Sequence, residues 1–103
     1  MGTQVVNTTS SDLDRRLKAG EKVVLIDVRE PSEVAEGKIP GAINIPLGQL
    51  PDRLKEIDAD KEAVIICRSG GRSTRACEIL LENGFQHVKN LSGGMLGWSG
   101  DVE

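Results

Sequence analysis

Short apolar runs alternate along this chain with segments in which apolar residues recur every three or four positions. The two clearest runs are residues 23–28 and 63–66, which are apolar at nearly every position. A run without alternation predicts a strand that is buried on both faces, as in a parallel sheet covered on its two sides. Weaker strand candidates are residues 4–6, 43–45 and 88–91.

The segments between these runs carry helical spacing and helix boundary residues. Ser10 or Ser11 can cap a first helix, which contains Leu13 and Leu17 and stops at Gly20. A second, short helix is predicted to open at residues 29–33, with Pro31 in its first turn. Farther along, Leu47, Leu50, Leu54 and Ile57 fit one helical face. Another helix is predicted from residue 72 or 73 to 82, and a short last helix holds Trp98.

The alternation of strands with helices predicts an α/β fold. We expect three layers, in which helices flank both faces of a mainly parallel sheet. The 103 residues contain no internal repeat and suit one compact domain, which we take to span residues 1–103. Ligands in such folds bind beyond the carboxyl ends of the strands. The segment that leaves the strand 63–66 at Cys67 is therefore the first place to look for a site.

Composition and charge argue against several classes of function. The formal net charge is −3 with scattered lysines and arginines, and only Phe85 and Trp98 could stack on bases, so we expect no nucleic-acid partner. The apolar runs are too short to cross a membrane, and the N-terminus lacks the pattern of a signal peptide. We expect a cytoplasmic monomer that does not bind a membrane.

The chain has two cysteines, which are too few for a disulfide framework. Cys67, Cys77 and the single histidine, His87, lack the spacing of metal ligands, so we expect no metal site and no cofactor. Cys77 shares a predicted helix face with Leu80 and Leu81, which favours packing in the core over a redox pair with Cys67. His87 follows the carboxyl end of that helix and should lie far from a loop at its amino end.

Cys67 is followed by a sequence that is suited to holding an anion. Two consecutive glycines allow the backbone to curl so that its N–H groups converge, and a helix N-terminus adds unpaired N–H groups. Two arginines add positive charge. A cysteine in such a setting should have a lowered pKa and react as the thiolate. We take Cys67 as the nucleophile, and as substrate-binding residues Arg68, Ser69, Gly70, Gly71 and Arg72.

Asp27 and Arg29 flank the end of the strand predicted at residues 23–28. Their side chains can form a structural ion pair or can clamp a substrate, and the residues alone leave both interpretations open. We favour the structural pair, because bidentate contacts between arginine and a carboxylate often tie loops down.

Four blocks of the sequence resemble the single-domain rhodanese family, in that family's order. They are residues 25–30 (LIDVRE), 37–46 (GKIPGAINIP), 67–73 (CRSGGRS) and 84–98, which begins with Gly-Phe and continues through Leu-Ser-Gly-Gly to tryptophan. Together they extend over residues 25–98, which is most of the chain. One departure is Lys38, where many members of the family carry histidine.

The resemblance implies a rhodanese-like domain with a sheet of five parallel strands. It implies that Cys67 accepts sulfur, that the backbone of residues 68–72 forms the cradle around it, and that Asp27 and Arg29 are mainly structural. The implied enzyme is a sulfurtransferase of the thiosulfate type, which moves sulfane sulfur through a persulfide on Cys67. Its expected partners are a small anionic donor such as thiosulfate or a persulfide, an acceptor such as cyanide or a thiol, and a sulfur-relay protein.

Two other functions fit a cysteine in an anion cradle. Cysteine-based phosphatases and arsenate reductases resemble a pattern of cysteine, five residues and arginine, whereas four residues separate Cys67 from Arg72. A loop that is one residue shorter should hold a sulfur atom better than a tetrahedral phosphate. A non-catalytic binding module on the same scaffold is the other alternative, which the presence of Cys67 disfavours.

Overall fold

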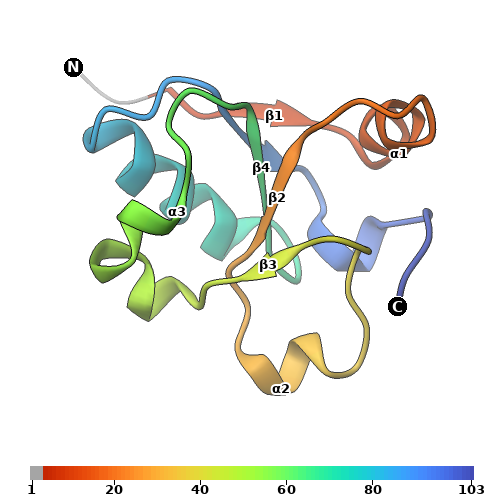
Figure 1. The fold of residues 1–103 in the computed structure, drawn as a ribbon. Coiled ribbons are helices and arrows are strands. Elements are labelled where there is room, and N and C mark those ends of the chain that lie inside the picture. The colour runs from red at the N-terminus through yellow and green to blue at the C-terminus, as the bar shows by residue number, and fades with distance from the viewer. Residues whose placement is uncertain (1–3) are drawn as a thin grey trace.

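Residues 4–103 are described by a computed structural model, and within them five strands form one sheet (Figure 1). The bounds of the strands are Val6–Thr8 for β1, Val24–Asp27 for β2, Ile43–Asn44 for β3, Ala63–Ile66 for β4 and Val88–Leu91 for β5. The strands lie in the order β1-β5-β4-β2-β3, and each neighbouring pair is parallel. The predicted α/β class with a parallel sheet is confirmed.

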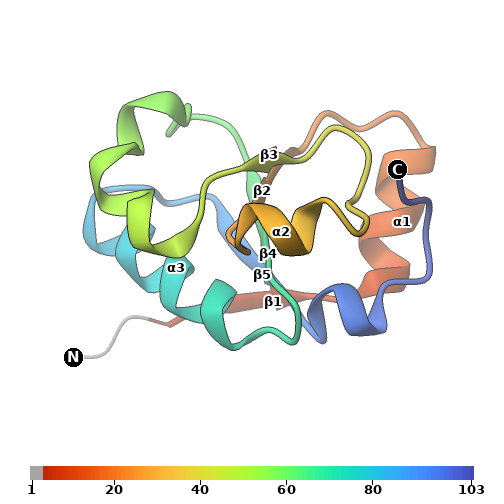
Figure 2. The same cartoon turned by 90° about the horizontal axis from the view of Figure 1, so that it is seen from below.

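Helices lie on both faces of the sheet and at its carboxyl edge. The α-helices are α1 (Ser10–Lys18), α2 (Pro31–Val34) and α3 (Gly71–Glu82), and the 3₁₀-helices are η1 (Leu47–Asp52), η2 (Leu54–Glu56) and η3 (Gly94–Gly97). Helix α3 and η1 cover one face, whereas α1 and η3 cover the other (Figure 1). Figure 2 shows α2 in front of the edge at which β2 ends. None of the helices in residues 4–103 has the length and apolar character needed to cross a bilayer.

The core of the described residues consists of two apolar clusters, one on each face of the sheet. Neighbouring residues of a strand point to opposite faces, so Leu25 and Val64 join one cluster and Ile26 and Ile65 join the other. Each of these side chains is buried, and burial of one such side chain stabilises the fold by about 1.5–3 kcal/mol. The central strands are apolar without alternation because both of their faces are covered.

The segment 47–57 does not form the single helix that its leucine spacing predicts. It forms η1 and η2, and Pro51 lies inside η1. A proline nitrogen has no hydrogen to donate, so an α-helical hydrogen-bond ladder is broken at this position. The short 3₁₀ turns still bury Leu50 and Ile57 against the sheet.

Several boundary predictions were wrong by one or two residues, including those for the first helix, the first strand and the last helix. The first helix is capped by Thr9, whose hydroxyl accepts the Asp12 N–H at 3.1 Å, and not by either of the two serines that follow. The first strand starts at Val6 and so lies later than the predicted residues 4–6. The last helix is the 3₁₀ turn η3, which ends one residue before Trp98. None of these changes moves the carboxyl edge of the sheet.

Candidate active site

Cys67 directly follows β4 at the carboxyl edge of the sheet. It is 1% exposed and belongs to the apolar cluster beneath α3. The chain then turns and enters α3 at Gly71, so the cysteine lies between a strand end and a helix start. This is the position at which open parallel sheets bind their ligands.

Several hydrogen-bond donors converge on the sulfur of Cys67. The Gly70 N–H donates to Sγ with a nitrogen–sulfur distance of 2.9 Å, and the Ser73 hydroxyl oxygen lies 3.2 Å from Sγ. Burial raises the pKa of the thiol, but hydrogen bonds from the Ser73 hydroxyl and from the backbone N–H groups of Ser73, Gly70 and Ser69 outweigh it. The pKa of Cys67 is therefore below its ordinary value, which favours the thiolate.

Gly70 has the backbone conformation that curls the loop around the sulfur. Its φ is +109°, in the left-handed region that side chains disfavour. Gly71 does not share this conformation, because it is the first residue of α3. Of the two consecutive glycines, only Gly70 therefore has a backbone conformation that requires glycine.

Asn90 of β5 holds the Ser73 hydroxyl beside the sulfur. Both side chains are buried, and the Ser73 hydroxyl has two acceptors within reach, Asn90 Oδ1 and Cys67 Sγ, which share its single proton. Asn90 Nδ2 donates in turn to Asn7 Oδ1 at 2.9 Å, across the paired strands β1 and β5. No local pattern indicates the contact between Ser73 and Asn90, which are 17 positions apart in the sequence.

Replacing Ser73 by alanine should raise the pH midpoint at which iodoacetamide alkylates Cys67. The hydroxyl stabilises the thiolate more than the thiol, so its loss should raise the pKa of Cys67. Peptide mass spectrometry over a pH series follows this cysteine separately. Cys77 does not interfere, because burial raises its pKa to about 12.

Asn83→Ala is the matched control for this measurement. The Asn83 side chain donates to the Ile79 carbonyl at 2.7 Å, at the opposite end of the same helix. Its loss should leave the midpoint of Cys67 unchanged. If Ser73→Ala also leaves the midpoint unchanged, the hydroxyl does not support the thiolate.

The turn η3 holds the carbonyl side of the cysteine loop. The Met95 N–H donates to the Cys67 carbonyl at 2.8 Å, and the Leu96 N–H donates to the Arg68 carbonyl at 3.0 Å. Gly94 comes immediately before them with φ +55°, and a Cβ atom on it would lie 2.5 Å from both carbonyl oxygens. Because the loop's carbonyls are bound on this side, its N–H groups are left to face the sulfur.

Arg72, in the first turn of α3, directs its guanidinium to Glu33 of α2. Nη1 and Nη2 donate to Oε1 and Oε2 at 2.7 and 2.8 Å, which is a bidentate fork. The bond from Arg72, and after it the bond from the Glu30 N–H, lower the pKa of Glu33 to about 2. Arg72, which was expected to bind an anion, is thus already paired with the carboxylate of Glu33, 39 positions earlier. The spacing of residues in the sequence did not indicate this pair.

Asp27 and Arg29 form a buried ion pair at the end of β2. The Arg29 Nε and Nη2 atoms donate to the two carboxylate oxygens, with a shortest contact of 2.7 Å. The same guanidinium also donates to the carbonyls of Glu33 and Gly37 at 3.2 and 2.8 Å. The pair therefore ties the segment that contains α2 to the sheet, which is the geometry of a structural contact.

A hollow of about 330 Å³ opens beside the cysteine loop. Arg68 of the loop and Leu96 of η3 line it, together with Glu33, Glu36 and Val102 from other parts of the chain. Leu96 is 68% exposed, so an apolar side chain stands at the rim. The hollow thus brings together charged and apolar groups next to the loop that holds the cysteine.

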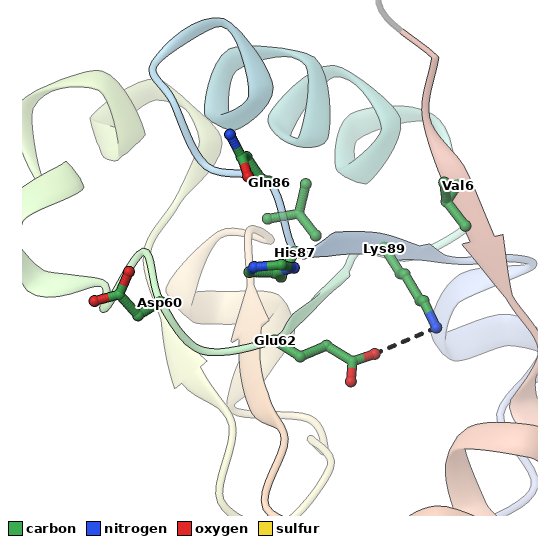
Figure 3. Close-up of a pocket in the computed structure, with 7 residues that line it drawn as sticks. Val6, Asp60, Glu62, Gln86, His87 and Lys89 are labelled. Atoms are coloured by element: carbon green, nitrogen blue, oxygen red, sulfur yellow. Dashed lines mark ion pairs between the residues drawn. The ribbon is translucent and has the colours of Figure 1, made fainter.

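A larger hollow of about 470 Å³ lies at the opposite end of the strands (Figure 3). His87 lines it, together with the ion pair of Glu62 and Lys89 at 3.3 Å. The His87 carbonyl accepts the N–H of Ala63 at the start of β4, whereas Cys67 follows the end of that strand. The predicted separation of His87 from the loop is confirmed.

Cys77 packs in the core, as its helix face predicts. It is 0% exposed and belongs to the apolar cluster beneath α3. Within residues 4–103, no group of three His, Cys, Asp or Glu side chains is placed to hold a metal ion.

Comparison with known proteins gives consistent relatives. The family model described as Rhodanese-like domain matches residues 9–101. The Putative sulfurtransferase YtwF of Bacillus subtilis is 44% identical, and the match covers 97% of this chain and 96% of that protein. A protein of Allochromatium vinosum named Sulfurtransferase is also 44% identical, and the match covers 87% of this chain and 84% of that protein. The Putative sulfur carrier protein YrkF of Bacillus subtilis is 37% identical over 86% of this chain and 48% of its own length.

Solved structures share the fold over almost the whole chain. The protein SSP1007 of Staphylococcus saprophyticus superposes with a TM-score of 0.90 at 33% identity, over 96% of this chain and 99% of that chain. The Rhodanese-like Domain Protein from Staphylococcus aureus gives a TM-score of 0.89 at 33% identity, over 96% and 97%. The family match extends from α1 to beyond η3 and includes the cysteine loop, and the chain therefore belongs to the rhodanese-like domain family.

Proposed function

We propose that this chain is a rhodanese-type sulfurtransferase, which carries sulfane sulfur as a persulfide on Cys67 and acts as one domain over residues 1–103. The observation that carries the proposal is the set of N–H and hydroxyl donors around Sγ. Such donors stabilise a thiolate and a persulfide anion alike. Two relatives that match most of this chain are named sulfurtransferases, which supports the same class of reaction.

The proposed reaction is a double displacement. The thiolate of Cys67 attacks the outer sulfur of thiosulfate, the sulfur–sulfur bond breaks, sulfite leaves with the bonding electrons, and Cys67 keeps the sulfur as a persulfide anion. Cyanide or a thiol then attacks that outer sulfur and takes it away, as thiocyanate or as a new persulfide. The bond between the two sulfur atoms on Cys67 breaks, and the Cys67 thiolate is regenerated. The first step moves no proton once the thiolate exists, so it requires no general base.

The loop binds the donor in this proposal. The N–H groups of Ser69, Gly70 and the first turn of α3 hold the charge on the sulfur, and Gly71 leaves the helix start free of a side chain. Arg68 lines the hollow and attracts an anionic donor. Arg72 supplies a second positive charge, which its carboxylate partner partly balances.

A protein thiol can serve as acceptor in the same way as a small thiol. One relative, named a putative sulfur carrier protein, contains a segment similar to this chain within 48% of its length. We therefore include a sulfur-relay protein among the proposed partners.

Intact-mass spectrometry tests the proposal directly. After incubation with thiosulfate or with glutathione persulfide, the chain should gain the mass of one sulfur atom and lose it again on addition of cyanide or a thiol. Peptide mapping should place that sulfur on Cys67. An aryl phosphate, offered to the same preparation, tests the phosphatase alternative. Hydrolysis of that phosphate without sulfur uptake from any donor would refute the proposal.

A further inference from the structure

The arginines around the cysteine loop are matched by carboxylates. Three arginines lie among four carboxylates: Arg29, Arg68, Arg72, Asp27, Glu30, Glu33 and Glu36. Arg29 is buried against Asp27, and Arg72 is held in the fork of Glu33. The site therefore presents much less positive charge to a ligand than its arginines suggest.

Glu33 is built into its position and is not a mobile surface acid. Its Oε1 accepts both the Arg72 guanidinium at 2.7 Å and the Glu30 N–H at 2.9 Å. The latter contact belongs to the capping box that starts α2, and the Glu33 carbonyl is bound by Arg29. The low pKa of Glu33, about 2, keeps it charged at neutral pH, so Arg72 always faces a carboxylate.

This pairing has a consequence for anions of different charge. A dianion that approaches the sulfur must either separate Arg72 from Glu33 or bring two negative charges close to that carboxylate. A monoanion needs only one compensating charge, which Arg68 and the N–H groups of the loop can supply. The two kinds of anion differ by one elementary charge. The site at which they are compared is partly exposed, because the side chains of Glu33 and Arg72 are 27% and 37% exposed.

We propose that Glu33 is a specificity-determining residue, which by holding Arg72 directs the site to singly charged sulfur donors, such as organic persulfides and thiosulfonates, and away from dianions such as thiosulfate. The inference rests on the proposed sulfurtransferase function and refines its donor class. For a thiosulfonate, the thiolate of Cys67 attacks the terminal sulfur, the sulfur–sulfur bond breaks, and a sulfinate anion leaves with the bonding electrons. Cys67 is left as the persulfide anion, with no oxidant or reductant required.

Two donors that differ by one charge make the test specific. Methanethiosulfonate is thiosulfate in which one anionic oxygen is replaced by a methyl group, so the reacting sulfur and its neighbour are the same. The wild-type chain should have the higher kcat/KM with methanethiosulfonate. Glu33→Gln should shift the ratio of the two kcat/KM values toward thiosulfate by roughly 3- to 10-fold, as expected for one charge that solvent partly screens.

Glu36→Gln is the matched control, because it removes the same charge from the same hollow without touching Arg72. It should change the ratio less than about 2-fold. Glutamine at position 33 retains the oxygen that accepts the Glu30 N–H, and a thermal melt checks that the fold is kept. Glu33→Ala is the second variant, and it should shift the ratio in the same direction. Equal shifts in the Glu33 and Glu36 variants, or no shift in the former, would overturn the inference.

A readout without turnover separates this inference from the proposed function. Sulfate and methanesulfonate, which differ by the same charge and transfer no sulfur, should slow the alkylation of Cys67 by iodoacetamide. Glu33→Gln should improve protection by sulfate relative to methanesulfonate, whereas Glu36→Gln should not. Unchanged relative protection would refute the role of Glu33 even if sulfur transfer occurs. Improved relative protection without any sulfur transfer would leave the charge selection intact and reject the sulfurtransferase.

Discussion

Cys67→Ser will abolish sulfur uptake by this chain and reduce transfer to the background rate. The serine hydroxyl is not ionised at neutral pH, and an alcohol oxygen does not form the persulfide on which the double displacement depends. We expect a loss on the order of 10³-fold or more, because the proposed nucleophile itself is removed. The fold should be retained, since a serine of similar size can still accept the Gly70 N–H.

Two measurements check this result, namely turnover with thiosulfate and cyanide, and the intact mass after donor treatment. Cys77→Ala is the matched control, because it removes the other cysteine from the core and leaves every residue of the loop unchanged. It should lower the free energy of unfolding by about 1–2 kcal/mol and leave sulfur uptake in place. Uptake that persists in Cys67→Ser, or that moves to the other cysteine, would contradict the assignment of the nucleophile.

Gly94→Ala will destabilise the fold and disorder the cysteine loop together. The new Cβ atom would lie 2.5 Å from the carbonyl oxygens of Cys67 and Arg68, and residue 94 has φ +55°. Backbone atoms cannot move aside as a flexible side chain can, so the two hydrogen bonds from η3 to the loop must lengthen or break. We expect a loss of about 2–4 kcal/mol in the free energy of unfolding.

Urea denaturation measures this loss, and the alkylation rate of Cys67 at neutral pH reports on the loop. Gly97→Ala lies in the same 3₁₀ turn, but its Cβ atom would meet nothing within 4 Å, and its φ is not positive. We therefore expect this control to cost less than about 1 kcal/mol and to leave the alkylation rate unchanged. If the two variants are equally stable, the close approach of Gly94 to the loop does not affect the free energy of unfolding.

The strands and their parallel arrangement were predictable from local patterns. The run 63–66 forms β4 without change, and the run 88–91 forms β5. The prediction of β4 rests on continuous burial, which appears directly in its residue types, whereas β5 has the sequence VKNL and was the weaker candidate. The helical face predicted over residues 47–57 packs on the core, but the leucine spacing did not detect that Pro51 interrupts an α-helical hydrogen-bond ladder, so the segment forms two 3₁₀ helices.

The candidate site was predictable only in its contiguous part. Cys67, its glycines and the following helix start are adjacent in sequence, so their proximity follows from local geometry. Glu33, Asn90 and Gly94 come from other elements, and no local pattern indicates that they contact the loop. Their contacts depend on how α2, β5 and η3 converge at one edge of the sheet.

The sequence by itself indicated the candidate cysteine, the curled loop that follows it and the parallel sheet, because each follows from neighbouring residues and their spacing. Only the tertiary structure decided how much charge that loop presents. The two arginines of the loop suggest a strongly positive site, yet Arg72 is bound at 2.7 and 2.8 Å by Glu33, which lies 39 positions away. Electrostatic potential depends on distances in space, and distances between remote residues exist only once the chain has folded.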